Sequence, residues 1–189
     1  MFLAEKNIEV PLVSIDVQRG EHREADFLAK NPWGQVPVLE LPDGTCISES
    51  VTICRYMEEL HPALSLFGTS ARERADIEMW QRRAEFGVFI PAVEYGHHTS
   101  PFFRDSMQQI PEWASHCKAH VLRTWQLFEP ALSDREYLAS SGFSIADVTA
   151  FVGTEVALLW SVTIPPELKR LVEWHARVAG RPSAATVAY

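Results

Sequence analysis

The stretch that decides the fold is Asn31-Pro32-Trp33-Gly34-Gln35-Val36-Pro37-Val38-Leu39, a loop that runs into a strand. Pro37 stands just inside the strand and removes one ladder N–H, so the backbone there is able to meet something other than a neighbouring strand. A cis Val36–Pro37 bond would turn the N–H and C=O of Val36 outward, where an extended peptide-like ligand can add as a further strand. The alternative interpretation is an ordinary edge-strand proline.

The segments around this stretch predict a mixed fold. The β-branched segment 10–17 predicts a strand, and apolar spacing over 23–30 predicts a short helix. Residues 36–41 and 45–47 predict two strands joined by the turn Pro42-Asp43-Gly44. The order strand, helix, strand, strand, helix suits a helical crossover followed by an antiparallel hairpin.

The helix that closes this half begins at a polar pair. We expect Ser48 to cap a helix over about 49–60, which His61-Pro62 ends. Free N–H groups and the positive end of the helix dipole make its start a natural carboxylate site. The Ser50 hydroxyl is able to donate to a carboxylate and Glu49 to hold an ammonium, or both residues only cap their own helix.

Beyond residue 68 the pattern becomes wholly helical. Helices are predicted over 72–96 with a kink at Pro91, over 113–132, over 144–160, and from Pro165-Pro166 to about residue 180. The charge changes at the same place, because residues 1–68 hold five Lys and Arg against eleven Asp and Glu. We therefore expect two domains, at 1–66 and 70–189.

Composition excludes several classes of protein. The 189 residues carry a net charge of −8, which argues against a nucleic-acid binder, and no apolar run approaches the ~20 residues that cross a bilayer. The three cysteines (Cys46, Cys54, Cys117) include no C-x-x-C pair, and no secretory leader precedes them, which fits a reducing cytoplasm. His116 and His120 lie one helical turn apart without a further ligand nearby in sequence, so we expect no metal site.

Taken together, Val-Pro entering a strand, an Asp-Gly hairpin and Glu-Ser opening a helix resemble the glutathione-binding half of the glutathione S-transferase family, in its theta-like, phi-like and related bacterial branches. The segment 142–148 resembles the capping box and hydrophobic staple of that family's helical domain. Its physics predicts reciprocal hydrogen bonds between Ser144 and Asp147, with Phe143 packed on Val148.

The resemblance implies a thioredoxin-like N-terminal domain, lacking its first strand in this chain, and an all-α C-terminal helical bundle. It also implies a homodimer, with glutathione as a co-substrate and no resident cofactor. The backbone of Val36 would pair with the cysteinyl part of glutathione beside a cis Pro37.

The two ends of glutathione are assigned by the same resemblance. Glu49 and Ser50 would bind the γ-glutamyl end. His22 and Gln35 would lie near the glycyl carboxylate, with Arg23 as a weaker candidate.

The electrophile would be met by residues of the first long helix in the second half: Trp80, Arg83, Phe86, Phe89 and Tyr95. The family's catalytic Ser, Tyr or Cys follows the first strand, whereas residues 2–7 here resemble the end of the first helix. We therefore expect that strand and the catalytic turn to lie ahead of Met1, and we assign no catalytic residue in this chain.

The expected function is that of a glutathione transferase, which activates the glutathione thiol for attack on a small hydrophobic electrophile. Activity of the 189-residue form would then depend on the segment expected ahead of Met1. One alternative is a catalytically silent glutathione- or ligand-binding protein. The other is a non-enzymatic dimeric interaction module, since a fold does not fix a function.

Overall fold

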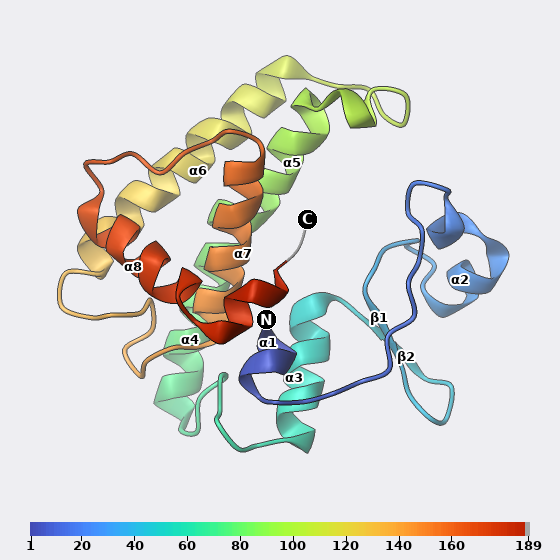
Figure 1. The fold of residues 1–189 in the computed structure, drawn as a ribbon, viewed down its shortest axis with the longest axis horizontal. Coiled ribbons are helices and arrows are strands. Elements are labelled where there is room, and N and C mark those ends of the chain that lie inside the picture. Colours follow the sequence, from blue (N-terminus) through green and yellow to red (C-terminus); the bar gives the residue numbers. More distant parts are fainter. Residues whose placement is uncertain (188–189) are drawn as a thin grey trace. The chain divides into compact units, whose positions relative to one another are not determined.

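The computed structural model describes residues 1–187 and divides into two compact units. One unit consists of Phe2–Leu64, and the other consists of Met1 with the residues from Ser65 onward. Figure 1 traces the elements of both units along the chain.

The first unit combines short helices with a two-stranded sheet, in the order α1 (Phe2–Glu5), a 3-10 turn (Glu21–Arg23), α2 (Ala25–Lys30), β1 (Val38–Glu40), β2 (Cys46–Ser48) and α3 (Ser50–Leu60). β1 and β2 pair antiparallel, with Val38 opposite Ser48. The side chain of Asp43 accepts a hydrogen bond from the N–H of Thr45 at 2.9 Å, which closes the turn between them. The predicted hairpin is therefore confirmed.

The predicted strand over 10–17 is wrong. Residues 8–16 are extended but belong to no sheet, and Leu12 and Val13 are 86% and 84% exposed. A strand exists only where a neighbour completes its hydrogen-bond ladder, and in residues 1–187 the sheet contains β1 and β2 alone.

A buried ion pair anchors the start of this unit. The ammonium of Lys6 lies 2.7 Å from Oε2 of Glu58 in α3 and donates to the carbonyl of Ala63 at 2.8 Å. Because its side chain is fully buried, these partners offset the cost of removing the charge from water. The contacts hold the end of α1 against the end of α3.

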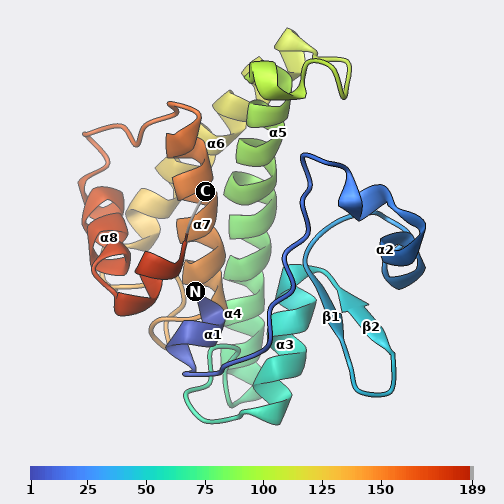
Figure 2. The same ribbon diagram turned by 45° about the vertical axis from the view of Figure 1, so that its right-hand side comes forward.

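The second unit is helical, in the order α4 (Ala71–Ala84), a π turn (Glu85–Phe89), α5 (Ile90–Thr99), a 3-10 turn (Pro101–Phe103), α6 (Pro111–Ala131), α7 (Ile145–Leu159), α8 (Lys169–Ala179) and a 3-10 turn (Pro182–Thr186). α7 packs against α4, α5 and α8, and α5 packs along α6. Figure 2 shows α4 and α5 following one another as a single long rod. The core includes Trp125 and Trp174, neither of which is exposed.

Two features of these helices differ in detail from those that the sequence predicts. The interruption expected at Pro91 is a π turn placed one turn earlier, because proline has no N–H for the carbonyl four residues before it. The last helix begins at Lys169 and not at Pro165-Pro166. A residue that precedes a proline is kept out of the α region, so Pro165 accepts from the N–H of Leu168 in a turn instead.

The start of α7 forms the capping box that the sequence predicts. Oδ2 of Asp147 accepts from the N–H and the hydroxyl of Ser144, each at 3.1 Å. Oδ1 accepts from the N–H of Leu138 and from the indole of Trp174, each at 2.9 Å. Burial raises the pKa of Asp147 to about 6, although all four hydrogen bonds act to lower it. The ring of Phe143 contacts Tyr137, and its packing on Val148 stays a prediction.

Candidate functional site

The loop between α2 and β1 is organised by Asn31, which caps the end of α2 and is only 4% exposed. Its Nδ2 donates to the carbonyl of Gln35 at 2.7 Å, and its Oδ1 accepts from the N–H of Trp33 at 3.2 Å. Its backbone carbonyl accepts from the N–H of Gly34 at 2.9 Å. One residue therefore fixes the path of the chain up to Val36, a role that the sequence pattern did not predict.

Val36 emerges from this loop as an open edge. The Val36–Pro37 peptide bond is cis, as the resemblance implies. Within residues 1–187 neither the N–H nor the C=O of Val36 has a hydrogen-bond partner, and the residue is 48% exposed. Such a backbone is able to pair with an extended ligand, because both of its ladder groups are available.

The hairpin register brings two of the predicted segments together. Val38 lies opposite Ser48 in the antiparallel pair. Val36 precedes that pair by two residues and Ser50 follows it by two, so both lie at the same end of the hairpin. The turn at Asp43 lies at the other end.

Glu49 has an unusual backbone at this end of the hairpin. Its φ is 67° and its ψ is 115°, and it occupies the cap position of α3. Ser48 was expected to cap this helix, but it is the last residue of β2 and pairs with Val38. A glutamate with positive φ is strained by about 1–3 kcal/mol, a cost that is typical of binding sites. Glu49 and Ser50 are both exposed, and Ser50 is the first residue of α3, where the helix N–H groups lack intrahelical partners.

His22 lies beside the same loop. Gly34 has a φ of 62°, and a Cβ on it would stand 3.1 Å from the carbonyl oxygen of His22. The close approach therefore requires glycine. Nε2 of His22 accepts from Nε of Arg23 at 3.1 Å, while Nδ1 is buried without a hydrogen-bond partner among the described residues. The structure thus places the backbone of His22, in the 3-10 turn, beside Gly34, the residue before Gln35.

The buried thiol of Cys54 is not a nucleophile at neutral pH. Burial raises the pKa of Cys54 to about 11, so its thiol stays protonated. The three cysteines Cys46, Cys54 and Cys117 are free.

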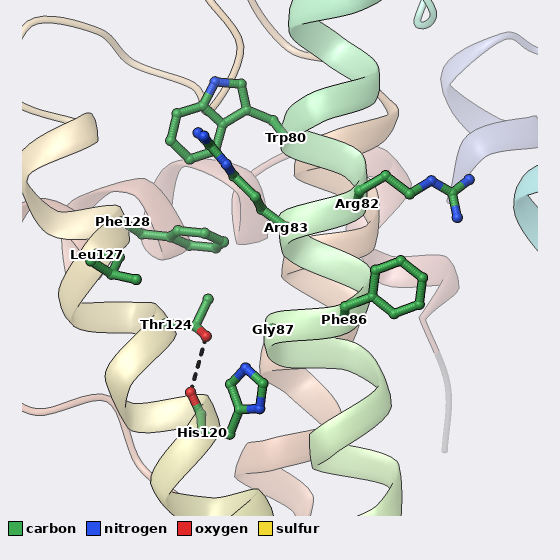
Figure 3. A pocket seen from close by; sticks show the side chains of 9 residues that line it. All are labelled: Trp80, Arg82, Arg83, Phe86, Gly87, His120, Thr124, Leu127 and Phe128. Carbon is green, nitrogen blue, oxygen red and sulfur yellow. Dashed lines mark hydrogen bonds between the residues drawn. The ribbon is translucent and has the colours of Figure 1, made fainter.

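A cavity of about 600 Å³ lies in the second unit, lined by residues of α4, the π turn and α6: Trp80, Arg82, Arg83, Phe86, Gly87, His120, Thr124, Leu127 and Phe128. Figure 3 shows Trp80 and Arg83 reaching from α4 toward Phe128 of α6. The volume of the cavity falls in the range of small-molecule pockets.

The electrostatics of this cavity combine aromatic rings with cations. The guanidinium of Arg83 lies 4.7 Å from the ring centroid of Trp80, and Arg82 pairs with Glu78 at 2.8 Å. Burial, assisted by the neighbouring cation of Arg123, lowers the pKa of His120, so its ring is neutral at pH 7.

The structure places three of the five expected second-substrate residues, Trp80, Arg83 and Phe86, around this cavity. Phe89 lies against Gly153 of α7, where an added Cβ would stand 2.8 Å from the Phe89 Cα. Tyr95 lies near the ammonium of Lys118, which is 6.0 Å from its ring centroid. The roles of all five residues in binding an electrophile stay predictions.

Sequence reasoning missed the α6 wall of the cavity, formed by residues 120, 124, 127 and 128. Their spacing of four, three and one along a helix places them on one face, and this spacing is the signal that could have found them. Within residues 1–187 no group of three or more His, Cys, Asp or Glu is arranged to hold a metal ion, and no helix is long and apolar enough to cross a membrane.

Comparisons with known proteins give matches that cover nearly the whole chain. Residues 1–60 match the family described as glutathione S-transferase, N-terminal domain. Glutathione S-transferase 2 of Saccharomyces cerevisiae is 37% identical over 185 residues, which cover 96% of this chain and 79% of the yeast protein. The crystal structure of a glutathione S-transferase domain-containing protein from Marinobacter aquaeolei gives a TM-score of 0.93 at 41% identity, over 99% of this chain and 92% of that one. The crystal structure of Gtt2 from Saccharomyces cerevisiae gives a TM-score of 0.92 at 36% identity, over 99% and 92%.

Proposed function

Because the chain belongs to the glutathione S-transferase family, we propose that it binds glutathione and presents its thiol to a small hydrophobic electrophile. Its fold is that of the family, with a thioredoxin-like N-terminal domain and a helical C-terminal domain. The observation that carries the proposal is the hairpin register, which sets the open backbone of Val36 and the start of α3 at one end of the sheet.

Each part of glutathione has a partner in this proposal. The cysteinyl backbone pairs with the N–H and C=O of Val36, beside Pro37. The γ-glutamyl carboxylate meets the Ser50 hydroxyl and the first N–H groups of α3, and its ammonium meets the carboxylate of Glu49. The strained φ of Glu49, at 67°, supports this assignment because such strain persists where a ligand needs a fixed geometry.

In the proposal, the glycyl carboxylate binds at the loop between α2 and β1. Gln35 belongs to that loop, the backbone of His22 lies beside its neighbour Gly34, and Arg23 is hydrogen-bonded to His22. Residues 1–68 carry more than twice as many acidic as basic side chains, so the attraction for an anionic tripeptide comes from these local donors and not from the field of the whole domain.

The reaction forms one carbon–sulfur bond. The thiol of bound glutathione gives its proton to solvent, and the thiolate sulfur attacks the electrophilic carbon. With a chloronitrobenzene, chloride leaves with the bonding electron pair and the thioether is the product. Cys54 does not compete as a nucleophile, since its raised pKa keeps it protonated.

We propose that the cavity lined by Trp80, Arg83 and Phe86 binds an apolar surface, either that of the electrophile or that of a second copy of this chain. Its aromatic lining and its volume of about 600 Å³ suit a small hydrophobic electrophile. Phe86 and Leu127 are 55% and 65% exposed at its edge, which also supports a homodimer in which a second copy covers this face. Light scattering on Leu127→Glu separates these two uses, because a dimer contact predicts a monomeric variant and an electrophile pocket predicts an unchanged mass.

The compartment in the proposal is the reducing cytoplasm, since all three cysteines are free.

Two assays test the function. Retention on immobilised glutathione, eluted by free glutathione, is expected for any glutathione-binding form, and its absence would leave only a non-enzymatic interaction module. Thioether formation with a chloronitrobenzene, measured by absorbance, separates a transferase from a silent glutathione-binding protein.

A further inference from the structure

His98 links the last turn of α5 to the start of α6. Its side chain is 7% exposed, and its Nδ1 accepts a hydrogen bond from the N–H of Ile110 at 3.0 Å. Ile110 occupies the cap position of α6. The bond therefore ties the beginning of one helix to the end of the helix before it, across the connection formed by residues 100–110.

This bond depends on the protonation state of the imidazole ring. A neutral imidazole has one N–H and one lone pair, and the lone pair has to be on Nδ1 to accept from Ile110. The proton of neutral His98 is therefore on Nε2, which lies 3.7 Å from Oε2 of Glu94. A second proton has only Nδ1 to go to, where it would face the N–H of Ile110 as donor against donor. The imidazolium therefore loses the bond to Ile110.

Glu94 supplies a counter-charge to the imidazolium. Its carboxylate also lies 3.4 Å from Nδ1 of His97 and accepts from Nε1 of Trp113 at 3.1 Å. Burial raises the pKa of Cys117 on α6, and the charge of Glu94 raises it further, so this thiol stays neutral. Protonation of His98 thus exchanges a hydrogen bond to the backbone for an ion pair with Glu94.

The other charged or titratable side chains on the elements packed against α5 have contacts elsewhere or form no ion pair. Glu155 of α7 pairs with His175 at 2.6 Å, and Asp147 of α7 belongs to the capping box. The remaining ones are Glu85, paired with Arg82, Lys118, which lies near the ring of Tyr95, His116, stacked on Trp113, and Arg104, Asp105 and Glu112, which form no ion pair within residues 1–187. Among the described residues, Glu94 is therefore the anion that faces His98.

We propose that His98 is a pH-sensitive clasp between α5 and α6: the neutral ring holds the N–H of Ile110, and protonation at Nδ1 releases it. The release is local, because Nε2 of Gln109 keeps its hydrogen bonds to the carbonyls of His97 and Ser100, at 2.9 and 2.7 Å. The clasp is closed at high pH and opens as the pH falls through the range in which histidine titrates. It does not depend on the proposed function, because neither His98 nor Ile110 is assigned to glutathione.

The measurement is hydrogen exchange of the Ile110 amide from pH 8 to pH 5, given as a protection factor, which removes the intrinsic dependence of exchange on pH. Amides of α8 report changes in global stability. His98→Asn places an amide group, which does not titrate, where the ring nitrogen stands. His97→Asn is the matched control, because the ring of His97 contacts Phe103 at 4.6 Å between centroids. Glu94→Gln removes the counter-charge.

Loss of one backbone hydrogen bond is expected to lower the protection of the Ile110 amide about tenfold between pH 8 and pH 5, in wild type and in His97→Asn alike. Protection is expected to stay constant in His98→Asn, and in Glu94→Gln the fall is expected at a lower pH. Constant protection in wild type, or the same fall in His98→Asn, would overturn the proposal. If His98→Asn does not unfold cooperatively in urea, Glu94→Gln decides: a shifted fall supports the clasp, and an unshifted fall overturns it.

Discussion

The substitution Asp147→Asn tests the electrostatic account of the helical domain. Asp147 is buried, and four hydrogen bonds reach its two oxygens. In the variant the oxygen facing Leu138 and Trp174 is kept, while the NH₂ group faces the N–H of Ser144, which loses its acceptor. That loss costs about 1–3 kcal/mol at any pH.

The pH dependence sets the magnitude. The pKa of Asp147 is about 6 in the folded protein, against 3.8 for an unperturbed aspartate. Between these values the folded state holds a proton that the unfolded state has lost, so raising the pH through this window removes stability. At 1.36 kcal/mol per pKa unit the loss amounts to about 3 kcal/mol. Asparagine has no proton to lose, so wild type is expected to be the more stable protein near pH 4 and to lose most or all of that advantage by pH 7.

The assay is urea unfolding of both proteins, followed by circular dichroism from pH 4 to pH 7. Carboxyls whose pKa is lowered, such as those of Glu73 and Asp76, titrate in both proteins and cancel in the difference. A difference in the free energy of unfolding that stays constant or widens with rising pH would refute the reasoning.

Two further substitutions test the packing of each unit. Lys6→Met removes the ammonium from the buried Glu58 carboxylate and is expected to cost about 3–5 kcal/mol in urea unfolding, whereas the double variant with Glu58→Leu is expected to regain most of it; equal losses would contradict this. Gly96→Ala places a Cβ 2.2 Å from Nε1 of Trp160 and is expected to cost about 1–3 kcal/mol in thermal unfolding. Gly44→Asn, at a φ of 84° with no atom within 4 Å of an added Cβ, is the near-neutral control.

The parts of the fold that the sequence predicted well are those set by local chemistry. The turn Pro42-Asp43-Gly44 and the capping box at Ser144 and Asp147 each carry their own hydrogen-bond partners within a few residues. The strand over 10–17 was wrong because a strand depends on a neighbour, which no local pattern supplies. The last helix begins later than predicted because Pro166 keeps Pro165 out of the α region, so the chain forms a turn before the helix starts.

In the site, too, the features that follow from local motifs were predicted and those that depend on the folded chain were not. The cis bond at Val36–Pro37 and the helix start at Ser50 followed from motifs, whereas the positive φ of Glu49 did not, because nothing in its residue type favours that conformation. The role of Asn31 depends on which carbonyl its amide reaches, which only coordinates supply. In the helical domain the cavity is lined by α4 and the π turn as far as Gly87, so it includes Trp80 and not Tyr95 of α5.

Glutathione titration into wild type, Ser50→Ala and Glu49→Ala tests the central claim most directly. Both side chains are exposed, so their removal leaves the core unchanged. Each substitution removes one hydrogen bond or ion pair to a charged group of the ligand, which predicts an affinity loss of about 10- to 100-fold with unchanged urea unfolding. Affinities equal to wild type in both variants would contradict the assignment of the γ-glutamyl end to the start of α3.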